Sequence, residues 1–486
     1  VWPPHSSSTH KYPRKITCFP PSSLSLSIIS HYGKLSCTMA VPKVEKDKLV
    51  YDIKLSSVVP GKVSGENESH ELKPIDLAMK LHYLKGLYFF PNNKTNNNDN
   101  NDNNSLISIG EFKNPMFEWL VSYFMTCGRI RLSSDPNPRP VIKLNDAGIR
   151  IIEARSGKTV HEWLAMEGFP ALQDQLVYGH ALGPDLGFSP LVFIQVTLFK
   201  CGGVSVGLSW AHILGDVFSA SAFMNVLGQH LQGKKAQILA YPDYPRPEYL
   251  LAGPSQEPLS LKRVDPVGEH WVAATNCKMG THVFNLSSTQ LAQLISKVHG
   301  PKADEQRVDK CFEVISAIMW RTLAKIRKDL EPRVVTVCRP KSLERAHVIP
   351  HNGQVISTVE VNFSASHADT LELVSMITEN KVDESSLVEE VVEKDSGKFD
   401  YIIYGANLTF VDMEEADIYG FKVEGQCPIF ASYTIGGVGE AGAVLVLPGV
   451  KDGKNEDNTG RVIIVTLPEY ELEAVKNELK KEWYLV

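Results

Sequence analysis

One stretch of the chain can be read as two strands, a turn and a helix in succession. Residues 192–231 read VFIQVTLFKCGGVSVGLSWAHILGDVFSASAFMNVLGQHL. The run Val192–Phe199 is apolar and rich in β-formers, Gly202-Gly203 marks a turn, and Val204–Trp210 alternates like a second strand. From Val217 to Leu231 the apolar residues recur at helical spacing. We therefore expect a β-hairpin that leads through a short turn into a helix.

The turn between the second strand and the helix carries the candidate catalytic side chain. His212 lies where a central strand is predicted to end, and Asp216 follows four residues later. Rigid elements on both sides would hold the imidazole, and a neutral imidazole can take a proton near pH 7. Asp216 could pair with a cation or cap the helix. The alternative is a satisfied, half-buried histidine, because 15 histidines and 56 acidic residues also produce HxxxD spacing by chance.

Composition limits the classes of function. The 486 residues are 43% hydrophobic and 22% charged, as in a globular protein with a large core. Fifty basic and 56 acidic residues give a net charge of −6, so we expect no nucleic-acid partner. No apolar run approaches the roughly 18–20 residues that span a bilayer, which leaves peripheral attachment open. The eight cysteines form no CxxC pair, so we expect reduced, structural thiols and no metal site.

Two segments differ in composition from the rest. Residues 1–38 contain no Asp or Glu and several Ser/Pro clusters, and the first methionine is Met39. They read as a transit peptide or as translated upstream sequence with the true start at Met39, and on either reading we expect them to lie outside the fold. The stretch 92–104 is almost entirely Asn and Asp, which predicts a solvated loop.

A Pro-rich connector begins after Gln232 and suggests the domain boundary. We expect an N-terminal domain over residues 39–231, a crossover over 232–270 and a C-terminal domain over 271–486. The second half contains a predicted helix at 312–327, a strand at 461–467 and a closing helix from 468 to 481. These patterns predict two α/β domains.

A literal GxGxxG occurs at residues 437–442, and a strand-like run follows it. A dinucleotide site needs a helix at that position. We therefore interpret the glycines as a hairpin turn.

The chain resembles the plant BAHD acyltransferases, which use acyl-CoA donors. The HILGD sequence of residues 212–216 matches their HxxxD signature, and 72–90, 312–327 and 461–478 are similar to other family segments. Within the family the chain is most similar to the Eceriferum-type proteins of plant cuticular wax. That similarity lies in the stretches KLSSVVP at 54–60, GPDL at 183–186, 209–221 and YGANLTF at 404–410.

The resemblance implies two chloramphenicol-acetyltransferase-like domains, each a mixed sheet with helices, around a central solvent channel. His212 would lie in that channel as the general base, with Asp216 as structural support. It implies acyl-CoA as donor or ligand and no permanently bound cofactor.

The family's second motif, DFGWG, is absent. Residues 417–428 read DIYGFKVEGQCP; aligned on Pro428, Lys422 stands at the position of the motif's Asp, and Val217 replaces the glycine that usually follows HxxxD. Eceriferum-type proteins share this loss. The resemblance links them to very-long-chain fatty-acid elongation, as accessories of 3-ketoacyl-CoA synthase at the cytosolic face of the endoplasmic reticulum. The alternative is an active O- or N-acyltransferase that uses His212, in the cytosol.

Overall fold

The computed structural model describes a large part of the chain. The described residues are 48–65, 68–92, 105–136, 138–166, 172–179, 187–235, 257–264, 277–300, 311–341, 349–450 and 460–485. The chain divides into two units, residues 1–47 and residues 48–486, and all described residues belong to the second. The expected leader, all but the first residue of the Asn-rich stretch and most of the Pro-rich crossover lie outside the described residues.

The predicted hairpin lies inside a six-stranded sheet of the described residues, in the order β1-β6-β7-β8-β3-β16. The strands are β1 (Val50–Val58), β3 (Tyr83–Phe90), β6 (Ile149–Ser156), β7 (Val192–Phe199), β8 (Val204–Ala211) and β16 (Phe430–Gly436). Antiparallel pairing of β7 with β8 confirms the hairpin, and only β6 and β7 run parallel. The outermost strand β16 comes from the C-terminal half of the chain and pairs with β3.

The second sheet has seven strands in the described part of the chain, in the order β10-β18-β17-β15-β11-β12-β13. They are β10 (Met279–Leu286), β11 (Val334–Pro340), β12 (Gln354–Glu360), β13 (Val382–Asp383), β15 (Leu408–Asp412), β17 (Ala443–Pro448) and β18 (Arg461–Pro468). The sheet is mixed, because β15 runs parallel to both β11 and β17 while the other pairs are antiparallel.

The remaining strands of the described residues form two smaller sheets. They contain β2 (Ser69–Glu71), β5 (Pro140–Lys143) and β4 (Arg129–Leu132) in one, and β9 (Lys262–Val264) with β14 (Asp400–Ile402) in the other. Strand β9 belongs to the expected crossover and pairs antiparallel with β14, so this part of the crossover is bonded to the C-terminal half.

The seven-stranded sheet is buried on both faces. Along β17 the side chains of Ala443, Leu445 and Leu447 enter a core that also contains the strands of the six-stranded sheet. Val444 and Val446, which point to the opposite face because side chains alternate along a strand, enter a second core built mainly with helices. This continuous apolar run is typical of a strand without a solvated face.

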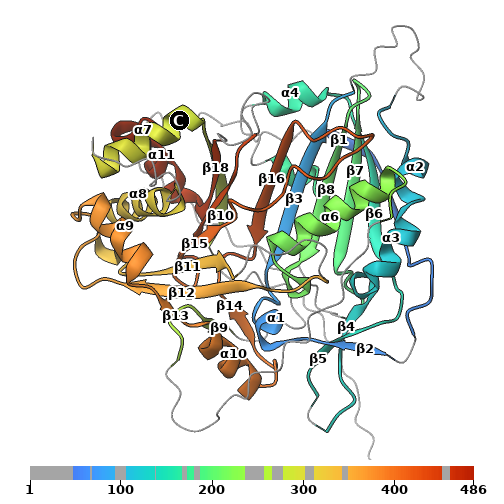
Figure 1. Ribbon diagram of the computed structural model, residues 1–486, viewed down its shortest axis with the longest axis horizontal. Coiled ribbons are helices and arrows are strands. Elements are labelled where there is room, and N and C mark those ends of the chain that lie inside the picture. Colours follow the sequence, from blue (N-terminus) through green and yellow to red (C-terminus); the bar gives the residue numbers. More distant parts are fainter. Residues whose placement is uncertain are drawn as a thin grey trace, which may run out of the picture. The chain divides into compact units, whose positions relative to one another are not determined.

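Helices cover both sheets (Figure 1). They are α1 (Pro74–Ala78), α2 (Ile109–Lys113), α3 (Met116–Ser122), α4 (Val160–Leu164), α6 (Val217–Leu231), α7 (Ser288–His299), α8 (Cys311–Ile326), α9 (Thr370–Glu379), α10 (Ser385–Lys394) and α11 (Glu469–Trp483). Helix α6 packs on the six-stranded sheet, where Phe223 contacts Trp210 of β8 with ring centroids 4.9 Å apart. Helix α8 packs on β15 and β17 and contacts α7, α9 and α11. No helix among these is long and apolar enough to cross a bilayer.

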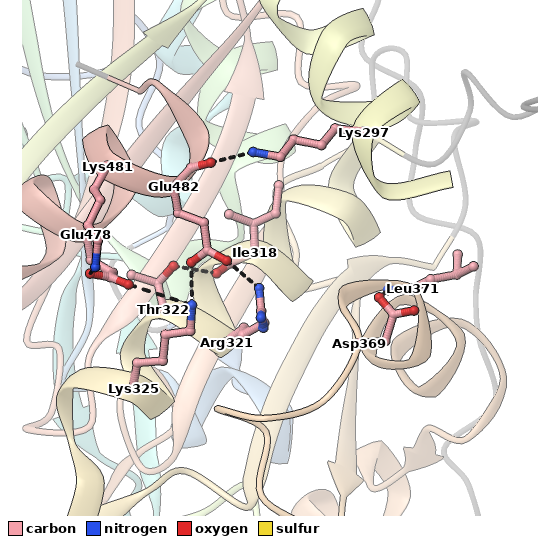
Figure 2. Close-up of polar contacts among 10 residues, drawn as sticks. All are labelled: Lys297, Ile318, Arg321, Thr322, Lys325, Asp369, Leu371, Glu478, Lys481 and Glu482. Atoms are coloured by element: carbon pink, nitrogen blue, oxygen red, sulfur yellow. Dashed lines mark hydrogen bonds and ion pairs between the residues drawn. The ribbon is translucent and has the colours of Figure 1, made fainter. Parts of the chain in front are cut away.

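The closing helix α11 is attached to α8 by charged side chains (Figure 2). The carboxylate of Glu482 pairs with Arg321 at 2.5 Å and with Lys325. Its backbone carbonyl accepts a hydrogen bond from Lys297 of α7. These contacts join the last helix of the chain to two earlier ones. The predicted closing strand and helix are confirmed by β18 and α11.

The glycine-rich segment 437–442 is not a hairpin turn, so that prediction is wrong. It follows β16 of the six-stranded sheet and leads into β17 of the seven-stranded sheet, and is therefore a crossover between sheets. A Cβ on Gly439 would lie 2.5 Å from the carbonyl oxygen of Gly405. The segment needs glycine because two backbones approach each other here.

Candidate active site around His212

His212 lies at the junction that the sequence predicts. Strand β8 ends at Ala211, a single 3-10 turn covers His212–Leu214, and α6 begins at Val217. The backbone amide of His212 donates to the carbonyl of His82, 3.1 Å away, so pairing with the chain before β3 continues past the strand end. The side chain is buried, with 1% of its surface exposed.

Asp216 caps the helix that follows. Its Oδ1 accepts hydrogen bonds from the amides of Phe218 and Ser219, both at 3.1 Å, which are donors that the first turn of a helix leaves unpaired. Its Oδ2 accepts from the amide of Gly353 at 3.0 Å. One buried carboxylate therefore holds the turn of His212 and a segment from the other half of the chain.

That segment, residues 351–353, runs directly into β12. The hydroxyl of Ser219 donates to the carbonyl of His351 at 2.9 Å and accepts from its amide at 3.1 Å. The amide group of Asn352 donates to the carbonyl of His212 and to the carboxylate of Asp76, both at 2.9 Å. The bond from Asn352 holds the backbone carbonyl of His212, and the bonds to Ser219 hold the first turn of α6.

Gly215 makes this close approach possible. Its φ is +152°, and a Cβ there would lie 2.8 Å from the amide nitrogen of His351. Only glycine fits where the two backbones lie so near each other. The indole of Trp210 donates to the Gly215 carbonyl at 2.9 Å, which holds the turn from its inner side.

The ring of His212 contacts a buried tyrosine. Nε2 of His212 lies 2.9 Å from the hydroxyl of Tyr404, and that hydroxyl donates to Oε1 of Gln354 at 2.6 Å. The ring of His82 lies 4.8 Å from that of Tyr404, and Nε2 of His82 accepts a hydrogen bond from the amide of Ile403. Three buried polar side chains, those of Tyr404, Gln354 and His82, thus surround the imidazole.

Burial controls the ionisation of these groups. It lowers the pKa of His212 and outweighs the opposing effects of its own backbone carbonyl and of Asp216, so the imidazole is neutral at pH 7. Burial, helped by the proximity of His212, lowers the pKa of His82 to about 3. It raises the pKa of Tyr404 well above its usual range. The described residues contain no group of three or more His, Cys, Asp or Glu side chains that could hold a metal ion.

The region that replaces the second motif packs against α6. Asn225 of α6 donates to the backbone carbonyl of Asp417 at 2.9 Å and to its carboxylate at 3.0 Å. A Cβ on Gly228 would lie 2.8 Å from the amide nitrogen of Lys422. Phe421 contacts the ring of Tyr88, with centroids 5.1 Å apart. This segment therefore supports the helix behind His212 although its residues differ from the motif.

Sequence reasoning identified His212 and Asp216 but missed four of their neighbours. His82, Gln354 and Asn352 carry no local pattern that sets them apart, and Tyr404 was singled out only as part of a stretch that resembles a family. They meet His212 through sheet pairing and through contacts between residues 50 to 192 positions apart.

Comparison with known proteins identifies the family to which the chain belongs. A model of the Transferase family matches residues 50–339. Protein ECERIFERUM 2 of Arabidopsis thaliana is 39% identical over 439 residues, which cover 88% of this chain and 98% of that protein. Protein ECERIFERUM 26 of the same plant is 37% identical over 435 residues, which cover 89% of this chain and 96% of that protein.

Solved structures give the same fold. Vinorine synthase has a TM-score of 0.63 at 15% identity and covers 89% of this chain and 98% of its own. A protein of F. graminearum complexed with coenzyme A and T-2 mycotoxin has a TM-score of 0.63 at 12% identity, covering 86% and 98%. The predicted two-domain, chloramphenicol-acetyltransferase-like α/β fold is confirmed. The chain belongs to the Transferase family of BAHD acyltransferases, and within it to the Eceriferum type.

Proposed function

We propose that this protein binds very-long-chain acyl-CoA and assists 3-ketoacyl-CoA synthase in the elongation of fatty acids for cuticular wax. The observation that carries the proposal is the 37–39% identity to two Eceriferum proteins over 96–98% of their lengths. Similarity on that scale extends over both domains, beyond the turn around His212. We place the protein at the cytosolic face of the endoplasmic reticulum, attached peripherally.

Acyl-CoA is proposed as a reversibly bound ligand rather than as a permanently bound cofactor. Membership of an acyltransferase family supports this, as does the likeness in fold to a protein complexed with coenzyme A. The acyl chain would enter through the channel expected between the two domains and pass close to His212.

A second candidate function is acyl transfer itself, in the cytosol. It is favoured by one observation: His212 is neutral at pH 7 and held rigidly between a strand and a helix. In that reaction an acceptor hydroxyl or amine gives its proton to Nε2 and attacks the thioester carbonyl. The C–S bond then breaks, and the CoA thiolate takes the proton back from the imidazole.

Co-expression separates the two candidates. The full chain is produced with a plant 3-ketoacyl-CoA synthase in a host that lacks very-long-chain wax precursors, and acyl chains are profiled by gas chromatography. We expect longer products only when both proteins are present, and the protein in the microsomal fraction, released by a carbonate wash. An unchanged profile, or acyl transfer by the protein alone to added alcohols or amines, would contradict the accessory function.

A further inference from the structure

A hydroxyl group of the protein already contacts the nitrogen of His212 that would act as the base. The Tyr404 hydroxyl lies 2.9 Å from Nε2, which is hydrogen-bond distance, and both side chains are fully buried. Nε2 is the atom that would receive the proton of an acceptor in acyl transfer. A general base must be within hydrogen-bond reach of the proton that it removes. The Tyr404 oxygen therefore stands where an acceptor oxygen would have to stand.

Several contacts hold this hydroxyl in place. On its far side it donates to Gln354 at 2.6 Å. The preceding residue, Ile403, is bonded through its amide to His82. Strand β14, which leads into Tyr404, is fastened by a buried ion pair of 2.5 Å between Lys80 and Asp400. The hydroxyl is fixed by both its side-chain partner and its backbone.

We propose that Tyr404 is an internal occupant of the acceptor position on His212, so that the site can hold an acyl thioester without transferring the acyl group. The inference rests on the proposed function in one respect, that acyl-CoA is the ligand. Burial keeps the pKa of Tyr404 far above its usual range, so the phenol stays protonated and is a poor nucleophile. The phenol has one proton and donates it to Gln354, so its oxygen accepts from Nε2–H of His212. Tyr404 thus blocks the base by keeping the proton on Nε2, and it does not replace the acceptor.

The substitution Tyr404→Phe tests this directly. It leaves the ring in place and vacates a space of about one oxygen atom beside Nε2, where a water molecule with a polar partner can bind. That water attacks the thioester carbonyl, the C–S bond breaks, and the water's proton passes through His212 to the CoA thiolate. The products are a free fatty acid and CoA.

Purified full-length protein is assayed with a very-long-chain acyl-CoA and a thiol reagent. We expect Tyr404→Phe to release CoA at least tenfold faster than the unchanged protein, and the double variant Tyr404→Phe/His212→Gln to return to the starting rate. The matched control is Tyr123→Phe, a buried tyrosine whose hydroxyl contacts no hydrogen-bond partner in the described part of the chain. We expect that control to change nothing. Gln354→Met, which frees the hydroxyl on its far side only, should give a smaller rise.

A second measurement does not depend on turnover. In protein labelled with 15N-histidine, the Nε2 resonance of His212, assigned by its loss in His212→Gln, should move in Tyr404→Phe and stay unchanged in Tyr123→Phe.

Three results would overturn the proposal. The first is His212-dependent CoA release by the unchanged protein at the rate of Tyr404→Phe. The second is an acyl group on Tyr404 in the mass spectrum. The third is a Tyr404→Phe variant that changes neither the rate of CoA release nor the 15N resonance. If the CoA-release and 15N results are as expected but the co-expression test fails, only the elongation function is rejected.

Discussion

The carboxylate of Asp216 accepts a hydrogen bond of 3.0 Å from the backbone amide of Gly353, which lies 137 residues further along the chain. The other oxygen of the same carboxylate caps α6. A single buried side chain therefore determines both the path of the turn that carries His212 and the entry into β12. Its role in the described contacts is to satisfy backbone donors that would otherwise be buried without partners.

We expect Asp216→Ala to lower the free energy of unfolding by about 2–4 kcal/mol, because a helix cap and the partner of a buried amide are lost together. Urea unfolding measures the change. The matched control is Asp369→Ala, an exposed cap of α9 whose side chain accepts one hydrogen bond, from Leu371 (Figure 2). That control should cost about 0.5–1 kcal/mol. Equal losses in the two variants would show that the bond to Gly353 contributes nothing.

His212→Ala should leave the very-long-chain products of the co-expression host within about twofold of the unchanged protein, because an accessory needs no base. The variant protein must be present at its normal level in the microsomes. A general base contributes roughly 10²–10⁴-fold to a rate. A product loss of that order in folded protein would establish the acyltransferase function instead.

The buried histidines make stability depend on pH. Burial holds the pKa of His82 at about 3, whereas in the unfolded chain it is 6.5. As the pH falls below about 6.5, the unfolded state binds a proton at His82 that the folded state does not bind. The free energy of unfolding therefore drops by up to about 1.4 kcal/mol per pH unit towards pH 3, and is recovered above 6.5.

Urea unfolding between pH 7.5 and pH 5 checks this for the unchanged protein and for His82→Gln. The glutamine carbonyl can still accept from the Ile403 amide, so the variant should fold and show a shallower dependence. Parallel curves for the two proteins would mean that His82 does not contribute.

Glu482→Gln should loosen the closing helix. The glutamine loses the ionic partners Arg321 and Lys325, which surround the carboxylate in Figure 2. Because the pair is partly exposed, we expect a loss on the order of 1 kcal/mol. Glu473→Gln, on an exposed face of the same helix, is the control and should not change the melting temperature measurably. Sensitivity to salt should be greater in the unchanged protein than in Glu482→Gln.

Gly228→Ala tests the contact that replaces the second motif. Alanine normally stabilises a helix interior relative to glycine by about 0.5–1 kcal/mol. Here the added Cβ would meet the backbone of Lys422 at 2.8 Å, so we expect a net loss of about 1–3 kcal/mol. Gly110→Ala in α2, whose Cβ would meet no described atom within 4 Å, should be neutral or stabilising. Thermal unfolding of both variants measures these changes. A Gly228→Ala variant as stable as the unchanged protein would show that the segment around Lys422 shifts at little cost.

Local patterns in the sequence were sufficient for the hairpin β7–β8, for α8 and for the place of His212 between a strand and a helix. Alternation and helical periodicity report which faces of an element are buried, and they need no knowledge of the partner. The same patterns could not assign the glycines at 437–442, because a turn within one sheet and a crossover between two sheets need the same residue type.

What the sequence by itself determined is therefore the type of the elements on either side of His212, the candidate base and, through its family resemblance, the fold. Only the tertiary structure decided what surrounds the base. Asn352, Gln354 and Tyr404 come from the other half of the chain, and they reach His212 because the strands and segments that carry them are packed against it. Hydrogen bonds between residues so far apart depend on how the sheets and loops are assembled, and that information is absent from any local stretch of sequence.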